Sequence, residues 1–571
     1  ILKRNPSCVA SSLLAHYFMT QKKRSSIYTV YLIVAFCISI NGLWAQTKYP
    51  TAEIEPYYDL SFTPAERDSL FRGLADYQKS FQALHQYKLN NSTPMSLVFD
   101  PIPVGMKLET IQKPIDWGLP KNVIVPANKE ELAFYPVYKL SVLLKTNKIS
   151  SVELTKLYIK RIKKYADTLQ CAITLLEESA LAQAKKADEE IAKGKYRGPL
   201  HGIPYGIKDL LSVEGTETTW GAAPYQDQVI SETATVVKKL EEAGAVLIVK
   251  LTMGALAMGD IWFGGVTKNP WNLKEGSSGS SAGSASATAA GLVAFAIGTE
   301  TLGSIVSPST RCGTSGIRPT FGRVSRHGAM ALSWSMDKIG PLCRSALDGA
   351  MVLNAIRGTD GLDNHVRDAA FNYAAKTDLK KLKVGYLKTL FDGNYPTKAN
   401  DQRALEVIKS LGLELIPVEL PTHIPVNAVR LMLTAEAAAA FDDLTRSNRD
   451  SLLTDQRRFA WPNTFRTARF IPAVEYINAS RIRYELVQAY YEKTKEFDVI
   501  ISPSFGGTQL LTTNLTGHPC VVVPNGFNAQ GSPTSISFLG KLFGEANVIA
   551  LVHAYQQASE WEDLVPPLFK N

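Results

Sequence analysis

Cysteine is scarce in this chain, with 6 among 571 residues. Cys8 and Cys37 lie within the first 45 residues, and the other four are scattered without the spacing of metal ligands. A disulfide framework and a cysteine-based zinc site are therefore excluded. Buried free thiols are the expectation for these four residues, which are Cys171, Cys312, Cys343 and Cys520.

The chain also lacks a concentrated patch of positive charge. Its formal net charge is +9, yet lysine and arginine are dispersed and form no stripe with aromatic residues, so we expect no nucleic-acid partner. A repeat of about 20 to 50 residues is absent too, which excludes a solenoid or a propeller. With 45% hydrophobic and 20% charged residues, the chain has enough apolar material for a large globular core.

One uncharged hydrophobic run, residues 27–44, follows the basic cluster at residues 22–24. This order is typical of a secretion signal, with Met19 as a candidate start and Ala45 as the small residue before cleavage. We interpret residues 1–45 as a leader and expect an exported protein, periplasmic or secreted. The alternative is an uncleaved membrane anchor, because the run is close to the shortest length that spans a bilayer.

Residues 46–130 are interpreted as an N-terminal extension. Thr63-Pro64-Ala65-Glu66 forms a capping box with proline at the first helical position, so a helix is expected to follow. Further prolines then interrupt the sequence and predict an irregular arm or linker. These prolines are Pro101, Pro103, Pro114, Pro120 and Pro126.

From Glu131 onward, helical and strand patterns alternate. This alternation predicts helices that cover a mixed sheet. The predicted helices begin at Ser151, after a capping box at 150–153, and cover about 177–193 and 233–243, with helical character again at 287–297; the predicted strands end at Lys208 and cover 245–250.

Two glycine-flanked groups of serines are the most informative feature of the chain. Residues 278–285 read SGSSAGSA and residues 298–304 read GTETLGS, and Lys208 lies upstream in GIPYGIKD. A serine hydroxyl needs a neighbouring base to become a nucleophile, and glycine lets main-chain amides approach a developing oxyanion. The pattern therefore indicates covalent acyl chemistry with a lysine as base.

These segments resemble the amidase signature family, whose pattern is GGSSGGSA followed by GTDxGGS, with a lysine earlier in the chain. The resemblance implies a single large α/β/α domain, residues 131–571, with a mixed, many-stranded central sheet. It extends from about residue 131 to the C-terminus through blocks at 198–204, 269–271, 316–320, 337–342 and 514–519.

The resemblance assigns Ser304 as the nucleophile, Ser280 as a serine held through a cis peptide bond, Lys208 as the base and Ser281 as a supporting hydroxyl. A free lysine has a pKa of about 10.4, roughly three units too high for a base at neutral pH, so burial must lower it. Asp209 follows directly, but successive side chains of a strand point to opposite faces. We therefore expect Asp209 to lie away from the amine.

The backbone amides of Thr301, Leu302 and Gly303 are expected to bind the oxyanion together with that of Ser304. Leu302 stands where the family pattern has a glycine. If this position needed a positive φ, leucine would cost about 1 to 2 kcal/mol, and its side chain would narrow the acyl pocket. The other departures are Ser278 and Ala282 in place of glycines, Glu300 in place of aspartate and Val306 in place of a frequent arginine.

The resulting hypothesis is an exported amidase that hydrolyses a small-molecule amide through an acyl-enzyme, without a metal or an organic cofactor. Two alternatives share its fold, a transferase like the A subunit of the glutamyl-tRNA amidotransferase and a catalytically silent binding protein. Neither the amide nor the oligomeric state follows from the sequence. Residues 365–500 are expected to shape the substrate pocket.

A rival interpretation uses the same glycine-rich run. Residues 279–283 match G-x-S-x-G, the nucleophile elbow of α/β-hydrolases, with Ser281 as nucleophile. An elbow requires a strand directly before it, and residues 269–275 predict a poor strand. It also requires a histidine base, for which His327, His365, His423, His518 and His553 are available.

Overall fold

The computed structural model of the protein describes residues 51–86 and 89–570. The chain divides into two compact units, residues 1–90 and residues 91–571. The predicted leader lies outside the described residues. Among the helices of the described ranges, none combines the length and apolar character needed to cross a bilayer.

The first unit is helical. It holds α3 (Thr51–Ile54) and α4 (Pro64–Gln86), joined by a 3-10 turn. The predicted capping box is confirmed, because the amide of Glu66 donates to Thr63 Oγ1 at 3.3 Å and the amide of Thr63 donates to Glu66 Oε2 at 2.6 Å. The extension is therefore helical after Thr63, as its sequence predicts.

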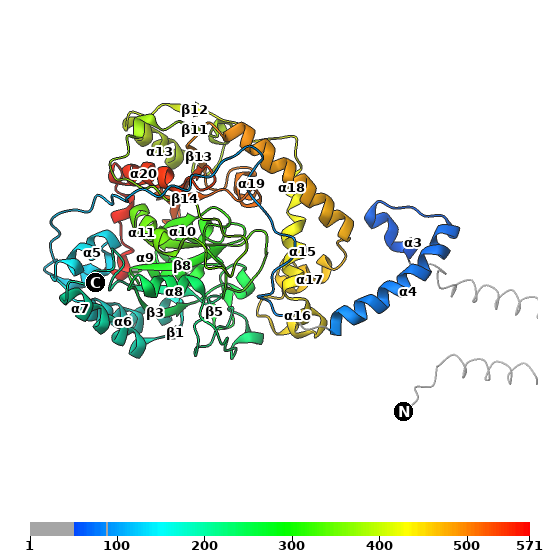
Figure 1. Cartoon of the computed structure of the whole chain (residues 1–571), viewed down its shortest axis with the longest axis horizontal. Coiled ribbons are helices and arrows are strands. Elements are labelled where there is room, and N and C mark those ends of the chain that lie inside the picture. The colour runs from blue at the N-terminus through cyan, green and yellow to red at the C-terminus, as the bar shows by residue number, and fades with distance from the viewer. Residues whose placement is uncertain (1–50, 87–88, 571) are drawn as a thin grey trace, which may run out of the picture. The chain divides into compact units, whose positions relative to one another are not determined.

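A mixed sheet of 11 strands forms the centre of the second unit. Figure 1 shows it running from β1 and β3 at the bottom of the view to β11 and β12 at the top. The sheet contains both antiparallel and parallel pairs, and the parallel pairs of β2 with β3 and of β2 with β8 hold the site described below. In sheet order, the strands are β1 (Ala172–Leu175), β3 (Val246–Leu251), β2 (Pro204–Lys208), β8 (Phe295–Glu300), β10 (Lys338–Cys343), β9 (Ser315–Arg318), β14 (Cys520–Phe527), β15 (Pro533–Gly540), β13 (Val499–Pro503), β11 (Val384–Tyr386) and β12 (Leu415–Pro417).

Two short ribbons lie outside this sheet. They pair β4 (Ile261–Trp262) with β5 (Gly265–Val266), and β6 (Lys268–Asn269) with β7 (Asn272–Gly276).

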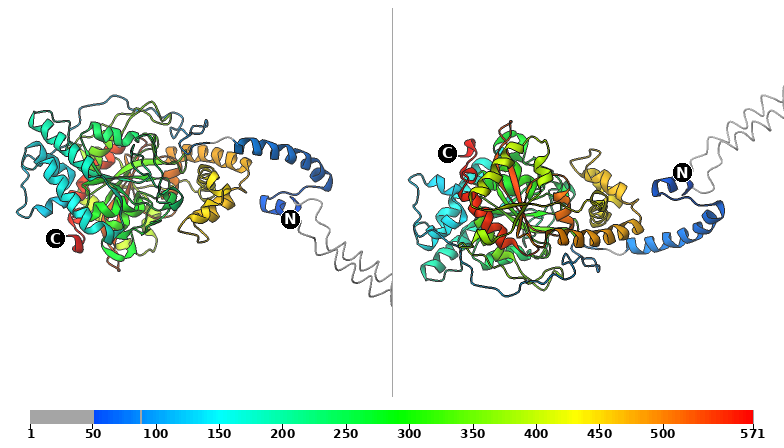
Figure 2. Two further views of the ribbon diagram at one scale, coloured as in Figure 1. Left: turned by 90° about the horizontal axis from the view of Figure 1, so that it is seen from below. Right: turned by 90° about the horizontal axis from the view of Figure 1, so that it is seen from above.

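Helices cover both faces of the central sheet, as the two views of Figure 2 show. In β9, a Cβ on Gly316 would meet Ser309 of α10, whereas Ile317 contacts Gly349 of α11. Because adjacent strand residues face opposite sides, α10 and α11 lie on opposite faces. The helices of this unit are α5 (Val137–Lys145), α6 (Ser151–Leu169), α7 (Glu177–Ala192), α8 (Thr235–Glu242), α9 (Ala282–Ala289), α10 (Val306–Cys312), α11 (Ala346–Ile356), α12 (Lys388–Asp392), α13 (Lys398–Ser410), α14 (Val426–Val429), α15 (Leu431–Ala440), α16 (Asp442–Arg446), α17 (Trp461–Ala468), α18 (Ala473–Thr494), α19 (Gln509–Leu515) and α20 (Glu545–Gln557).

The expected α/β/α architecture is confirmed, and so are most of the predicted elements, namely α6, α7, α8, β2 and β3. The prediction of helical character over 287–297 is wrong. Helix α9 ends at Ala289, Gly291 adopts a φ of 66°, and the chain continues as the buried strand β8. A short, continuous apolar run is compatible with a buried helix and with a buried strand, so the sequence pattern alone could not distinguish the two.

Residues 91–126 run as an irregular arm over the second unit. The Asn91 side chain donates to the carbonyl of Ala331 at 2.9 Å and accepts from the amide of the same residue at 2.7 Å. Farther along, the rings of Trp117 and Tyr373 stack with centroids 5.6 Å apart. The proline-rich stretch therefore belongs structurally to the large unit.

Candidate active site

Lys208 is the last residue of β2, and its side chain is fully buried between β2, β8 and the start of α9. Its Nζ lies 2.7 Å from Ser280 Oγ and 2.8 Å from Thr299 Oγ1. Burial lowers the pKa of Lys208 to about 7, although the carboxylates of Asp337 and Glu300 act in the opposite direction. The amine is thus poised to exchange a proton near neutral pH.

Asp209 lies away from this amine, as strand alternation predicts. Its carboxylate pairs with Lys250 at 2.9 Å and accepts from the amide of Thr219 at 2.8 Å. Both charged side chains of this pair are fully buried. Asp209 therefore fixes the end of β2 next to β3, and no carboxylate of the described residues bonds the amine of Lys208.

The serines of the first cluster occupy the turn before α9. The peptide bond between Gly279 and Ser280 is cis, as the resemblance implies. Ser281 Oγ accepts from the amide of Thr299 at 3.1 Å and donates to the carbonyl of the same residue at 3.0 Å. Ser281 thereby joins the turn to β8, in keeping with a supporting hydroxyl, and it lies 3.3 Å from Lys208 Nζ.

Gly298 makes this arrangement possible. A Cβ on Gly298 would lie 2.7 Å from Ser281 Oγ and 2.6 Å from the Leu342 side chain. Any larger residue would therefore displace the supporting serine from β8.

Ser304 lies in the loop between β8 and α10, with 9% of its surface exposed. Its carbonyl accepts from the amide of Ser281 at 3.2 Å, which places the two serine clusters side by side. Within the described residues, no hydrogen bond joins the hydroxyls of Ser280 and Ser304. Catalytic hydrogen bonds are often long in a free enzyme and shorten when substrate is bound.

The backbone amides of residues 301–304 donate no hydrogen bond to another group in residues 51–86 and 89–570. Within this segment, Gly303 adopts a φ of 83°. Unpaired amides on a buried loop are rare in folded proteins. Their arrangement fits donors reserved for a developing negative charge.

Glu300 anchors the loop between β8 and α10. Its Oε2 accepts from the amides of Ile305 and Val306 at 2.8 and 2.9 Å, and its Oε1 pairs with Arg318 at 2.8 Å. Burial would raise the pKa of Glu300, but Arg318, these amides and Asn514 lower it to about 2. The residue that departs from the family's aspartate therefore stays ionised and fastens the chain after Ser304.

The strain anticipated at Leu302 is absent, because Leu302 is not among the described residues with positive φ and Gly303 takes that conformation. The Leu302 side chain packs against an apolar cluster that includes Met336, Met432 and Leu515. Its neighbour Thr301 donates to Asp337 Oδ1 at 2.5 Å. Leucine is therefore a packing residue of this loop.

The remaining departures are also accommodated. Val306 is fully buried in a second apolar cluster with Leu387 and Val522. Ser278 takes a φ of 58°, and its hydroxyl bonds to that of Ser307 at 2.8 Å. Ala282 is the first, buried residue of α9.

Sequence reasoning missed two residues of the site, Thr299 and Asp337. Thr299 bonds the amine of Lys208, and its position inside the second glycine-rich motif was the available signal. Asp337 anchors Thr301 and accepts from the amides of Leu332 and Ser333 at 2.8 and 2.9 Å. Its motif is far away in sequence, so its contact with the loop could not be read from spacing.

The nucleophile elbow is not supported by the geometry. Residues 272–276 do form a strand, contrary to the expectation, but β7 belongs to a two-stranded ribbon and not to the central sheet. The hydroxyl of Ser281 bonds Lys208 and the backbone of Thr299, and no histidine of the described residues bonds to it.

A cavity of about 100 Å³ adjoins Thr299, whose hydroxyl bonds the amine of Lys208. Thr299, Thr301 and Asp337 line it together with Leu210 and Met330. The described ranges contain no group of three His, Cys, Asp or Glu side chains arranged to hold a metal ion.

Comparisons with known proteins point in one direction. The family model described as Amidase matches residues 153–510. The A subunit of glutamyl-tRNA(Gln) amidotransferase from Marinomonas sp. (strain MWYL1) is 34% identical over 475 residues, which cover 75% of this chain and 97% of that relative.

Solved structures agree with this match. The native peptide amidase from Stenotrophomonas maltophilia is 29% identical, with a TM-score of 0.67 over 75% of this chain and 97% of its own. An amidase family protein from Bacillus anthracis str. Ames is 25% identical, with a TM-score of 0.67 over 77% and 93%.

Proposed function

This chain belongs to the amidase signature family, whose members act on carbon-nitrogen amide bonds, and from this premise we propose that it hydrolyses a carboxylic amide through an acyl-enzyme on Ser304. The observation that carries the proposal is the amine of Lys208, which is buried, has a pKa of about 7 and lies 2.7 Å from Ser280 Oγ. A neutral amine in that position can accept a proton from a hydroxyl.

In the proposed cycle, Lys208 takes the proton of Ser280 while Ser280 takes that of Ser304. The Ser304 oxygen attacks the amide carbon, and the oxyanion is held by the free amides of residues 301–304. The carbon-nitrogen bond then breaks, the leaving nitrogen receives a proton back through Ser280, and ammonia or an amine departs. Water repeats the path, adds a hydroxyl to the acyl carbon and releases a carboxylic acid.

Labelling with a fluorophosphonate tests the role of Ser304. We expect the intact protein to be labelled and Ser304→Ala to be unlabelled, because the reagent phosphonylates an activated serine oxygen. Ser309→Ala is the matched control, since Ser309 is a buried serine of the adjacent helix α10 whose hydroxyl bonds to no group in the described residues. Persistent labelling of Ser304→Ala, or a folded wild type that never reacts, would contradict the proposal.

A second candidate is one component of an amidotransferase. The 34% identity to the A subunit of a glutamyl-tRNA(Gln) amidotransferase, over 97% of that relative, favours it. The same acyl-enzyme would form, and the released ammonia would pass to a partner protein. Stable co-purification with other subunits, and ammonia release that depends on them, would separate this function from independent hydrolysis.

Export is the further part of the proposal and rests on residues 1–45 of the sequence. An N-terminus near residue 46 in the mature protein would support it.

A further inference from the structure

A second cavity, of about 300 Å³, is formed by two segments of the large unit, one of which packs against the turn that carries Ser280. The loop 255–261, which follows β3, forms one wall, and the segment 453–462, which leads into α17, forms the other. Its volume is at the lower end of the range for small-molecule sites.

The first wall touches the catalytic turn directly. Asp260 Oδ2 accepts from the amide of Ser278 at 2.8 Å, two residues before Ser280. A Cβ on Gly279 would lie 1.8 Å from the carbonyl oxygen of Gly259, so the loop is packed against the cis peptide bond. The loop that forms this wall is therefore packed against the turn that carries Ser280.

The cavity carries one carboxylate without an ion pair of its own. Asp260 Oδ1 accepts no hydrogen bond from any residue in the described ranges. Arg457, the cation of the opposite wall, is bound in a two-bond pair to Asp455 at 2.7 and 2.9 Å and also interacts electrostatically with Asp260. The charged lining is thus net negative, with Asp260 on the side of the catalytic turn.

Gly276 leaves room for this carboxylate. A Cβ at residue 276 would lie 2.1 Å from Asp260 Oδ2. The orientation of Asp260 is thus fixed on both sides, by the missing side chain of Gly276 and by the amide of Ser278.

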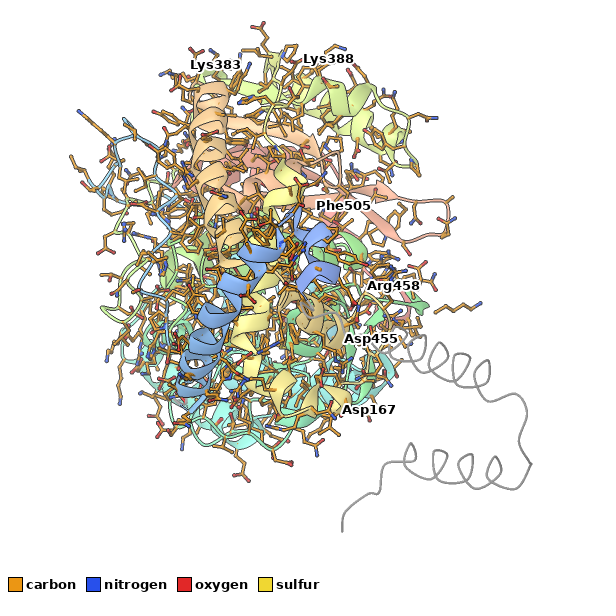
Figure 3. All side chains as sticks on the ribbon, turned by 90° about the vertical axis from the view of Figure 1, so that its right-hand side faces the viewer. Asp167, Lys383, Lys388, Asp455, Arg458 and Phe505 are labelled. Carbon is orange, nitrogen blue, oxygen red and sulfur yellow. The ribbon has the colours of Figure 1, made fainter. Side chains whose placement is uncertain are left out.

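The rest of the lining is apolar. The indole of Trp461 is held in place by its bond to the carbonyl of Leu256 at 2.9 Å, and Leu453, Phe459 and Met258 complete the surface. Figure 3 shows Asp455, which lines the cavity, and Arg458 of the same segment on the face turned to the viewer.

We propose that this cavity recognises the acyl part of the substrate, and that the substrate is the amide of an amino acid with an apolar side chain, whose free ammonium pairs with Asp260. The side chain would lie against Trp461, Phe459 and Leu453. This inference rests on the proposed amide hydrolysis and adds the chemical class of the substrate. A charge-assisted hydrogen bond of an ammonium to a half-buried carboxylate is strong enough to discriminate substrates.

Two amides that differ only in the amino group test this assignment, phenylalaninamide and 3-phenylpropanamide. We expect the wild type to prefer phenylalaninamide in kcat/KM by about 10-fold to 100-fold. Asp260→Asn keeps an oxygen for the amide of Ser278 and removes the charge, so the preference should fall to about 1, chiefly through a lower kcat/KM for phenylalaninamide. Asp227→Asn, which replaces an exposed aspartate outside the cavity, is the matched control and should keep the preference.

The preference should also depend on pH in a way that a structural role would not produce. It should decline above about pH 8, where the α-amino group of the substrate loses its proton. The groups that face this ammonium are Asp260, Asp455 and Arg457. An unchanged preference in Asp260→Asn, or equal losses for both amides, would overturn the inference.

Fluorophosphonate labelling distinguishes a wrong substrate class from a wrong proposed function. If Ser304 is labelled in wild type and in Asp260→Asn but both amides have the same kcat/KM, the substrate class is wrong and the proposed amide hydrolysis is retained. If Ser304 is never labelled, the proposed function itself fails.

Discussion

At the scale of single residues, the proposed chemistry depends on the environment of one amine. Burial between strands disfavours the ammonium form of Lys208, and the carboxylates of Asp337 and Glu300 restrain this shift. Neither carboxylate bonds the amine, whereas Ser280 and Thr299 do. The balance leaves a pKa of about 7, which is well matched to proton transfer at neutral pH.

Activity should therefore follow the ionisation of Lys208. In kcat/KM, we expect a rise through pH 7 to a plateau, as the amine loses its proton in the free enzyme. Lys208→Met should lose about 100-fold to 10,000-fold in rate, the usual contribution of a positioned base. A rate that is independent of pH between 5 and 9 would contradict this role.

The same amine links stability to pH. Its pKa is lower in the folded than in the unfolded state, so the unfolded chain binds more protons between about pH 7 and pH 10.5 and the free energy of unfolding should rise with pH in that window. Lys208→Met should flatten this rise in denaturant titrations. The control Lys238→Met removes an exposed lysine and should leave the slope unchanged.

At the scale of elements, the loop between β8 and α10 depends on one buried carboxylate. Glu300 accepts from two amides after Ser304 and pairs with Arg318, and both charged side chains are fully buried. Breaking one partner of a buried pair leaves the other charge without compensation.

Glu300→Gln should therefore destabilise the large unit by about 3 to 5 kcal/mol, measured as a shift of the urea unfolding midpoint. Glu275→Gln is the control, because Glu275 pairs with Arg311 where both side chains are partly exposed, and surface pairs contribute about 1 kcal/mol or less. Similar losses in both variants would show that burial of the Glu300 pair is not what matters.

At the scale of the whole molecule, the arm of residues 91–126 belongs to the large unit. Phe99 lies 3.5 Å from the buried guanidinium of Arg483, and Asp116 forms a β-bridge to Ala374. Residues 51–86 belong to the other compact unit.

Truncation should reveal this division. Protein lacking residues 1–90 should keep the thermal midpoint of the large unit and its fluorophosphonate labelling. Protein lacking residues 1–126 should melt at a lower temperature, because it also loses the ring stack of Trp117 and the contact of Phe99. Equal midpoints for the two proteins would show that the arm contributes nothing to stability.

Much of this architecture could be predicted from local patterns. Capping residues located α4 and α6, and the motifs around Lys208 and the two serine clusters predicted that these segments lie together. Contacts between distant segments could not be predicted in this way. The bond of Thr301 to Asp337 and the wall formed by 453–462 arise only when the chain folds, and the apolar run before Ile297 fits a helix and a strand equally well.

The four cysteines of the large unit are free and buried, as predicted, and burial raises the pKa of each thiol, to about 12 for Cys171 and about 11 for Cys520. Thiolates are the species that react with maleimides and iodoacetamides, and these sulfurs supply almost none at neutral pH. The native cysteines of the protein from residue 91 onward should therefore not react with thiol-directed fluorescent or spin labels. A single cysteine introduced at the rim of the second cavity could then be labelled selectively and would detect a molecule bound there, without replacement of any native thiol.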